Sequence, residues 1–306
     1  WKFLRLPVVS YAIPALVAGT PATFTLVAGD VLQLLSAVPD SCPGASRTET
    51  AGGMLIEYCD SGSGFDLTGT EIRSNAPVAV FSGHDCTFVP FDRWACDHLE
   101  EQIFPVEALG PDLFVPGTHP TRMDEPNRLR VVSAANGNTI RFEPPLDGVA
   151  EVTPLERGQF IEVEIRAPVW VRATGPILGA VFLVGQDYAG IGSAGRFAVG
   201  DPAMALVVPS AQFRTSYAIL VPDTYTESWI DIAVPSGGFA TLDGVLLREP
   251  EDVVGTSMSV GHVEIEAGVH LVGGTAPFGL YVSGLAAYTS YYVPGGMDFE
   301  PITPPF

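Results

Sequence analysis

The sequence contains very little lysine and few charged residues of any kind. Its 306 residues include a single lysine, Lys2, and charged side chains make up only 16% of the chain, whereas an average globular protein has about 25%. The lack of lysine excludes intramolecular Lys–Asn isopeptide bonds, which some adhesins contain, for nearly the whole chain. The net charge of −20 would repel a phosphate backbone or an anionic lipid surface. We therefore expect neither nucleic acid nor a membrane surface as a partner.

Long hydrophobic runs are absent as well. No apolar run reaches 18 residues, so no segment is expected to span a membrane. Lys2 and Arg5 precede an apolar stretch, as in a signal peptide, but Pro7 and Pro14 interrupt that stretch. We interpret it as part of the mature protein, with any targeting segment already removed.

Helical patterns are scarce, and only one short helix is expected. It would start at Asp97, because the sequence Asp-His-Leu-Glu fits a capping box. Pro105 would limit this helix to about two turns.

Turn-forming residues, by contrast, are abundant. The 33 glycines and 27 prolines make up about a fifth of the chain, and 47% of the residues are hydrophobic, which is too many for a disordered chain. Ile161, Val163 and Ile165 alternate with Glu162 and Glu164, which is the pattern of a half-buried strand. Composition and pattern together predict an all-β protein of short strands joined by many turns.

The chain also repeats itself at a spacing of about 100 residues. Residues 163–171, VEIRAPVWV, share five of nine positions with residues 263–271, VEIEAGVHL. Pro77, Pro176 and Pro277 each precede an apolar run that ends near a glycine, and they are 99 and 101 residues apart. Such self-similarity is the signature of repeated structural units.

We therefore predict three repeated β-sandwich-like units of about 100 residues. Unit 1 would cover residues 1–98, unit 2 residues 99–200 and unit 3 residues 201–297, followed by a proline-rich linker at residues 298–306. The apolar strands continue without evident linkers between units, which favours compact packing, with pseudo-threefold symmetry as one arrangement. A string of separate units is the alternative.

The four cysteines fall into two local pairs. Cys42 with Cys59 and Cys86 with Cys96 are the expected disulfides, although four cysteines allow three connectivities. Four free, buried thiols are the alternative interpretation. Disulfides would place the chain in an oxidising compartment, and hence outside the cell, either secreted or attached to the surface.

Two segments of the sequence resemble a known family. Residues 75–86, NAPVAVFSGHDC, and residues 96–102, CDHLEEQ, are similar to the signature of the N-terminal domain of the IgG Fc-binding protein family, a secreted, mucus-associated family with bacterial surface homologues. Residues 277–284 and 292–296 also resemble the end of that domain, so the resemblance covers roughly residues 8–297. It implies adhesion or protein binding at a surface or in mucus, and it carries over no catalytic residue.

Four polar residues next to the second cysteine pair are weak candidates for a metal site. His84, Asp85, Asp97 and His98 are of the types that bind divalent metals. The simpler interpretation is that a disulfide loop displays them and that Asp97 caps the short helix. We therefore expect no metal and no cofactor.

The same region offers little support for catalysis. Glu100 and Glu101 could suggest glycoside hydrolysis, which needs two carboxylates converging on one bond. Adjacent residues of a helix point about 100° apart, so a solvated face is the better interpretation. Ser82-Gly83-His84 lacks the Gly-x-Ser-x-Gly sequence of a nucleophile elbow.

Aromatic side chains are the remaining candidates for ligand contacts. Tryptophan and tyrosine often dominate binding surfaces, although in sandwiches they more often pack in the core. The candidate ligand-binding residues are Trp94, Trp170, Trp229, Tyr288 and Tyr291.

Taken together, these features predict an extracellular adhesion or recognition module that binds a protein or glycan without catalysis. Its partners would lie on another cell, in mucus, or among further domains of its own chain. A structural spacer or self-assembling surface component is the alternative, and a secreted glycoside hydrolase is a weaker one. Exposed aromatics at loop tips would favour recognition, whereas an acidic cleft would favour the hydrolase.

Overall fold

The fold was analysed in a computed structural model, which describes residues 13–37, 39–51, 54–60, 62–93, 95–118, 125–186, 188 and 199–302. The chain divides into two compact parts, Trp1–Val38 and Pro39–Phe306. In the first part, residues 13–37 form turns but neither strand nor helix. Residues 23–26, TFTL, alternate between polar and apolar side chains as residues 161–165 do, and this pattern predicts a strand, but they do not form one. Strand pairing needs a neighbour in register, which an alternating pattern alone does not supply.

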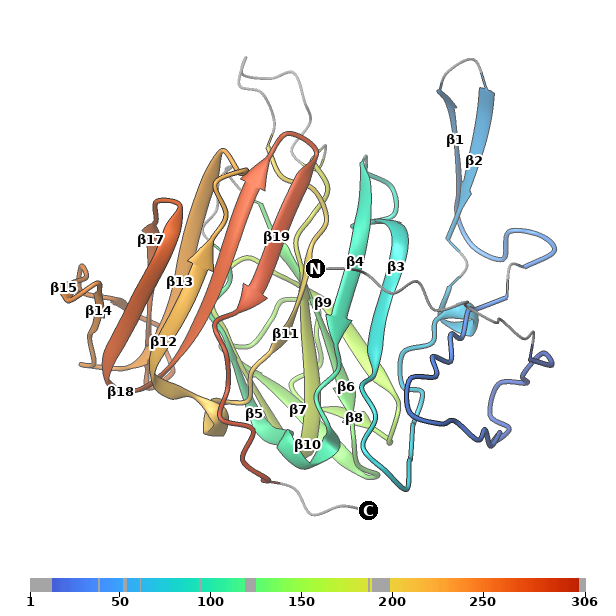
Figure 1. Cartoon of the computed structure of the whole chain (residues 1–306), viewed down its shortest axis with the longest axis horizontal. Helices are drawn as coiled ribbons and strands as arrows, with labels where there is room; N and C mark the ends of the chain where they lie inside the picture. Colours follow the sequence, from blue (N-terminus) through green and yellow to red (C-terminus); the bar gives the residue numbers. More distant parts are fainter. Residues whose placement is uncertain are drawn as a thin grey trace. The chain divides into compact units, whose positions relative to one another are not determined.

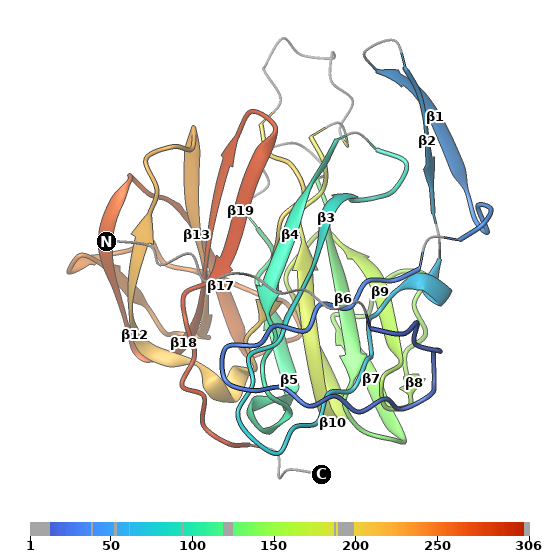
Figure 2. The same ribbon diagram turned by 45° about the vertical axis from the view of Figure 1, so that its right-hand side comes forward.

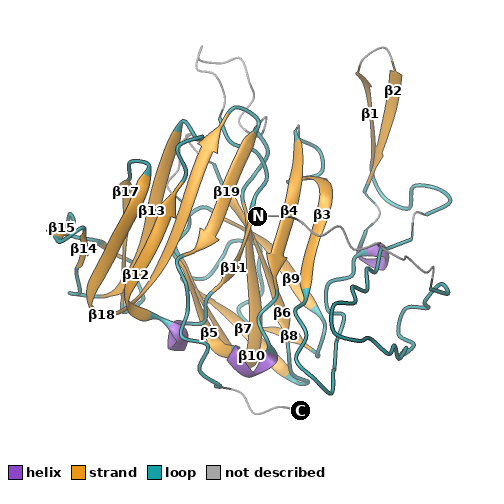
Figure 3. Cartoon of the chain, in the orientation of Figure 1, coloured by secondary structure: helices purple, strands orange, loops and turns teal. Residues whose placement is uncertain are grey.

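The second part, residues 39–306, is all-β, as the composition predicted. Its only helical elements among the described residues are three short 3-10 turns, η1 (Ser63–Phe65), η2 (Val106–Ala108) and η3 (Ser210–Gln212) (Figure 3). Two small antiparallel hairpins come first. β1 (Ser46–Ala51) pairs with β2 (Met54–Cys59), and β3 (Phe81–Phe88) pairs with β4 (Cys96–Gln102).

The helix predicted to start at Asp97 is wrong, because this segment is β4. Leu99 is buried, whereas its neighbours His98 and Glu100 are exposed, so burial follows the period of two that defines a strand. Pairing with β3 across the hairpin, for example Ser82 with Glu101, overrides the local capping-box pattern.

Two larger sheets follow (Figure 1). We call the first, with strand order β8-β7-β10-β6-β9 and with β5 and β11 also paired to β10, the first curled sheet. The second curled sheet has the order β15-β14-β18-β13-β17-β16, with β12 and β19 also paired to β18. Their strands are β5 (Gly110–Val115), β6 (Asn127–Ser133), β7 (Asn138–Glu143), β8 (Thr153–Leu155), β9 (Phe160–Ile165), β10 (Val169–Phe182), β11 (Met204–Val207), β12 (Arg214–Val221), β13 (Glu227–Pro235), β14 (Ala240–Leu242), β15 (Val245–Leu246), β16 (Glu251–Asp252), β17 (Met258–Glu264), β18 (Gly268–Ala286) and β19 (Thr289–Pro294).

The strand pairings of the first curled sheet recur in the second, which has β16 as an additional strand. β10 pairs with β5, β6, β7 and β11, and β18 pairs with β12, β13, β14 and β19. β6 pairs with β9 as β13 does with β17, and β7 pairs with β8 as β14 does with β15. The 100-residue repeat in the sequence therefore corresponds to a repeated topology.

Each curled sheet is built around one long strand that belongs to two layers. Up to Gly274, β18 pairs with β12 and β14, and from Gly279 it pairs with β13 and β19. One more β12 pair, Arg214 with Phe278, lies at the register shift between them, directly after Pro277. Pro176 occupies the corresponding place in β10. Strands that bend in this way let a sheet fold over on itself, and the apolar core lies between the two layers. Ile219, Ile230 and Phe278 are among its buried residues in the second curled sheet.

A third copy of this arrangement is not seen in residues 13–98 where the structure describes them. Pro77 is indeed followed by a strand, β3, but β3 pairs only with β4 among the described strands. A continuously apolar run such as the one after Pro77 is typical of a strand buried in a core, but this expectation is wrong here, because Val78 is 54% exposed and Phe81 58%. An apolar run has the same sequence pattern whether or not a second layer of strands covers it. The sequence alone therefore did not show that the strand after Pro77 differs from those after Pro176 and Pro277. The predicted threefold packing is likewise not seen.

Candidate functional site

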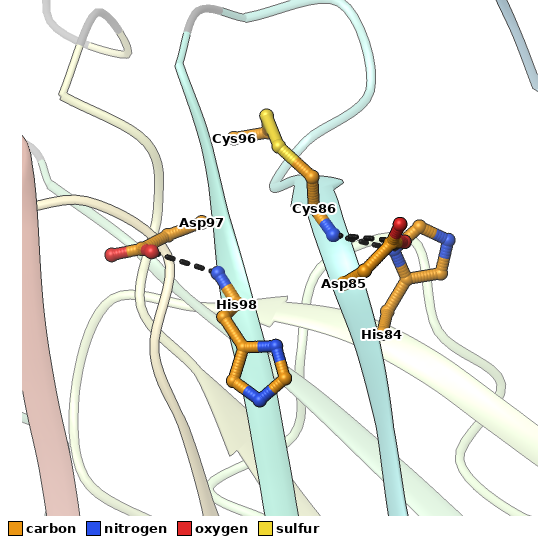
Figure 4. Close-up of a disulfide and its surroundings, with 6 residues drawn as sticks. All are labelled: His84, Asp85, Cys86, Cys96, Asp97 and His98. Atoms are coloured by element: carbon orange, nitrogen blue, oxygen red, sulfur yellow. Dashed lines mark hydrogen bonds and ion pairs between the residues drawn. A yellow bond between two sulfur atoms is a disulfide. The ribbon is translucent and has the colours of Figure 1, made fainter.

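The structure contains two disulfides, Cys42–Cys59 and Cys86–Cys96. The first closes the base of the β1–β2 hairpin, and the second joins β3 to β4 near the loop of residues 89–95 (Figure 4). In the part of the chain that the structure describes, no cysteine is free. Both bridges fit an oxidising compartment.

The four weak metal candidates lie beside the Cys86–Cys96 bridge but bond to neighbouring backbone. The Cys86 N–H donates to His84 Nδ1 at 3.0 Å and to Asp85 Oδ1 at 3.1 Å. On the other strand, the His98 N–H donates to Asp97 Oδ1 at 2.7 Å. Figure 4 shows the two pairs pointing away from each other. Over the described residues, no three His, Cys, Asp or Glu side chains gather as metal ligands would.

Glu100 and Glu101 lie on opposite faces of β4, because successive residues of a strand point to opposite sides. Glu100 is exposed and its carboxylate is 3.3 Å from His98 Nε2. Glu101 is half-buried on the same face as Leu99, and burial raises its pKa from 4.5 to about 7. These two carboxylates therefore do not converge on one substrate bond.

The proposed aromatic residues occupy different environments. Trp94 lies outside the described residues. Trp170 packs edge-on against Phe114 at 5.8 Å, with the Arg172 guanidinium over its ring at 3.8 Å. Tyr291 packs edge-on against Tyr225 at 4.7 Å.

Trp229 and Tyr288 complete that set. Trp229 lies half-buried in β13. Tyr288 is 58% exposed, at the turn between β18 and β19. Of the described candidates, Tyr288 therefore offers the most aromatic surface to a ligand.

Three chain segments that are far apart in sequence meet around Tyr288. The Gly185 N–H donates to the Val89 carbonyl in the β3–β4 loop at 2.7 Å, and the Gly200 N–H donates to Ala286 at 2.7 Å. The Tyr288 N–H donates to Gln186 Oε1 at 2.8 Å. Figures 1 and 2 show the turns of β3–β4 and β18–β19 at the same end of the sheets. Hydrogen bonds thus link the ends of β10 and β11 to both hairpins at this end of the sheets.

We call this the hairpin-end surface and define it by Arg93, Tyr188 and Tyr288. The Arg93 guanidinium lies 5.9 Å from the centre of the Tyr188 ring. The Tyr188 hydroxyl accepts a hydrogen bond from Arg166 at 3.1 Å. Tyrosine and arginine are the residue types enriched in protein-binding surfaces.

Buried polar groups hold the hairpin-end surface in place. Gln186 and Asp201 are 4% and 1% exposed. The Asp201 N–H donates to Ser290 Oγ at 2.8 Å, and Asp201 Oδ1 accepts the Gln186 N–H at 3.4 Å. Satisfied buried networks fix side chains in one arrangement, so Tyr288 is presented by a supported turn.

A second cluster attaches the β1–β2 hairpin to the disulfide loop. The Arg47 guanidinium lies 4.9 Å from the Tyr58 ring and 4.5 Å from the Phe88 ring, and the two rings pack edge-on at 4.7 Å. Cation–π contacts of this kind stabilise by about 0.5–2 kcal/mol. The two disulfide-bonded hairpins are therefore joined next to the hairpin-end surface.

Small-molecule binding has little room in this structure. The best-formed hollows of the described part have volumes of about 140 Å³ beside Arg214 and about 20 Å³ beside Asn127. Pockets for small ligands usually measure about 300–1,000 Å³. An exposed surface, not a cavity, is therefore the candidate site.

Sequence reasoning did not identify Arg93 or Tyr188 as site residues. Arg93 lies between the cysteines of a predicted disulfide, which was the one available signal, because such loops display their side chains. Tyr188 lies in a loop without periodic pattern. Its proximity to Arg93 depends on the Gly185–Val89 hydrogen bond, which sequence does not show.

Comparisons with known proteins give a consistent result. The model of a family described as IgGFc binding protein matches residues 6–284. The IgGFc-binding protein of Homo sapiens is 26% identical over 236 residues, which cover 75% of this chain and 4% of that protein. The chain thus spans a small part of this relative. A solved anti-sigma factor domain-containing protein is 13% identical and covers 60% of this chain and 81% of its own, with a TM-score of 0.18, which supports no conclusion about the fold. Over the described residues, no helix is long and apolar enough to cross a membrane.

Proposed function

The chain belongs to the IgGFc-binding protein family, and from this premise we propose that it is an extracellular recognition module that binds a protein through its hairpin-end surface. The family is one of binding proteins, and both disulfides fit secretion or attachment outside the cell. The acidic chain, with a net charge of −20, would favour partners that are neutral or basic at the contact.

The observation that carries the proposal is the exposed Tyr288, whose N–H donates to Gln186, two residues before the Tyr188 ring that lies under the Arg93 guanidinium. Tyrosine and arginine bury large amphipathic surfaces with few rotatable bonds for the area gained. Hydrogen bonds from Gly185, Gly200 and Tyr288 join the supporting segments. A surface fixed before binding loses less entropy when the complex forms.

The first ligand to test is the Fc region of immunoglobulin G, because the human relative is named for binding it. This chain spans 4% of that relative, so Fc binding by this segment is part of the proposal. Mucus glycoproteins are the second ligand class to test. Because they carry glycans, they also test whether the ligand is a glycan and not a protein.

The β3–β4 hairpin at the hairpin-end surface bears on whether residues 1–98 are a third copy of the repeated unit. We infer that residues 1–98 are a diverged third copy of the unit, followed by copies at 99–200 and 201–297 and a linker at 298–306. Its support is that the strand after Pro77, β3, pairs with the next strand, β4, just as the part of β18 after Pro277 pairs with the next strand, β19. The hairpin-end surface would then combine equivalent hairpins of three copies around a pseudo-threefold axis.

Replacing Tyr288 or Arg93 with alanine should weaken ligand binding by about tenfold or more each. Truncating a central tyrosine or arginine of an interface commonly costs more than about 1 kcal/mol, and about 1.4 kcal/mol is a factor of ten. The measurement is biolayer interferometry of the whole chain against immobilised Fc and against mucus glycoproteins.

Two matched variants control for the loss of an aromatic ring and of a positive charge. Phe239 is 46% exposed beside Thr275, at the opposite end of β13 from Tyr288, and Arg248 is exposed after β15. Phe239→Ala and Arg248→Ala should bind as the wild type does. If the wild type binds neither ligand class, or if the control variants lose as much binding as Tyr288→Ala, the proposal is wrong.

A further inference from the structure

The second curled sheet has an apolar outer face that the other described residues of its own part of the chain, 39–302, leave uncovered. Ile219, Val221 and Val272 point into its core, so the alternate residues of β12 and β18 point outward. The residues of this outer apolar face are Ala218, Leu220, Leu246, Val269 and Leu271. Leu220 is 70% exposed, Val269 74% and Leu271 62%. Large apolar patches of this kind on a sheet usually mark an interaction site.

The first curled sheet shows how an equivalent face is used. Phe114 lies between the core residues Leu113 and Val115 and pairs with Trp170 across β5 and β10. In β12, Ala218 and Leu220 likewise lie between the core residues Tyr217, Ile219 and Val221, and they pair with Leu271 and Val269 of β18. The face that carries Phe114 therefore corresponds to the outer apolar face.

The Phe114 face is covered by another curled sheet. Phe114 is fully buried, and it packs in one cluster with Ala233, Met258 and Val260 of the second curled sheet. Packing a sheet face against the face of another unit of the same topology is thus already present within this chain. At Leu220 and Val269, the described residues supply no such cover.

We propose that the outer apolar face is a dimer interface, occupied by the same face of a second copy of this chain. Related by a two-fold axis, the Leu220–Val269 pair of one copy would meet the pair of the other, which is the requirement for an isologous contact. Sheet faces pack in this manner in β-sandwiches, at about 10 Å separation.

The distribution of charge favours a second copy over a charged partner. The outward residues of β12 and of the first half of β18, from Ser216 to Leu220 and from Val269 to Gly273, carry no charge. At the rim, the Asp243 carboxylate is already engaged by His270 Nδ1 at 2.8 Å and by the Leu271 N–H at 2.9 Å. The chain has a net charge of −20, and this neutral face lets two copies touch without bringing negative charges together at the contact. A charged ligand would find no charge of opposite sign on this face.

The test is the oligomeric state of the whole chain by sedimentation velocity, from about 1 µM to about 1 mM. The wild type should shift from monomer to dimer with rising concentration. Because salt screens the long-range repulsion between the two acidic copies, dimerisation should strengthen from about 0.05 to about 0.5 M NaCl. A chain that stays monomeric throughout would overturn the proposal.

Leu220→Asp should weaken dimerisation at least about tenfold, because it places a carboxylate at the centre of the contact. Val254→Asp is the matched control. Val254 is 87% exposed in the turn between β16 and β17, away from the outer apolar face, and its replacement adds the same charge. The control should dimerise as the wild type does.

The variant Leu220→Lys distinguishes the effect of a charge placed in the contact from the effect of the net charge of the chain. It lowers the net negative charge of the chain, which by itself favours association, yet it should also weaken the dimer because the ammonium group would be desolvated in the contact. Circular dichroism establishes that each variant is folded. If folded Leu220→Asp and Leu220→Lys dimerise as strongly as the wild type, this face is not the interface. The same conclusion follows if Val254→Asp weakens dimerisation as much as they do.

Discussion

Replacing Phe278 with alanine is expected to reduce the free energy of unfolding by about 3–5 kcal/mol. Phe278 is fully buried directly after Pro277, where β18 passes from one layer to the other. Its ring packs edge-on against Tyr217 at 5.0 Å, and the Tyr217 hydroxyl donates to the Phe278 carbonyl. Removing the ring leaves a cavity at the bend, which the rest of the core can only partly fill. Urea unfolding followed by tryptophan fluorescence measures the change as a lower midpoint with an unchanged slope.

The matched control is Phe81→Ala, which removes the same ring after the corresponding Pro77. Phe81 is 58% exposed, and surface replacements usually change the free energy of unfolding by no more than about 0.5 kcal/mol. A large loss of stability in Phe81→Ala would mean that a second layer covers the strand after Pro77, and the description of β3 as an uncovered strand would be wrong.

Glu101→Gln is expected to stabilise the protein above neutral pH by about 1–2 kcal/mol and to have little effect at pH 4. Burial raises the pKa of Glu101 from 4.5 to about 7, so the folded state holds this proton more tightly than the unfolded state. The stabilising contribution of the protonated carboxyl is complete below pH 4.5 and is lost as the pH rises through about 7. The full shift would correspond to about 3 kcal/mol, and solvent around a half-buried side chain reduces it.

Thermal unfolding of Glu101→Gln and of the wild type at pH 4 and pH 8 measures this effect. Glu100→Gln removes the same formal charge one residue earlier, at an exposed position, and it should not reproduce the pH-dependent gain. Equal gains for Glu101→Gln at both pH values would contradict burial of the ionised carboxylate as the cause.

The repeat in the sequence predicted much of the fold, because β pairing and core patterning leave strong periodic traces. Pro176 and Pro277 were identified as equivalent from spacing alone, and both lie at the bend of a long strand shared by two layers. The all-β class follows from the same composition of turn-formers and alternating apolar residues.

Two expectations failed for a common reason, which is that they depended on neighbours. The capping-box pattern at Asp97 is compatible with a helix, but pairing with β3 places it in a strand. The apolar residues after Pro77 suit a core, but in the structure Phe81 lies at the surface. Local sequence describes what a segment can form, and tertiary contacts decide between the options.

The candidate site was less accessible to sequence reasoning than the fold. Tyr288 was among the aromatic residues proposed to contact a ligand, but nothing in the sequence placed it beside Gln186, about a hundred residues earlier. Exposed loop residues such as Arg93 have no periodic pattern, because they do not pack on one face of an element. Their grouping arises only when separate strands end at the same edge.

The passage of β18 through both layers has a mechanical consequence. β18 continues through Pro277 as one strand although its pairing shifts register there, so the layer that contains β12 and the layer that contains β13 share one backbone. Tension on either layer is carried directly into the other. The two layers would therefore yield together at high load, and one layer would not detach before the other.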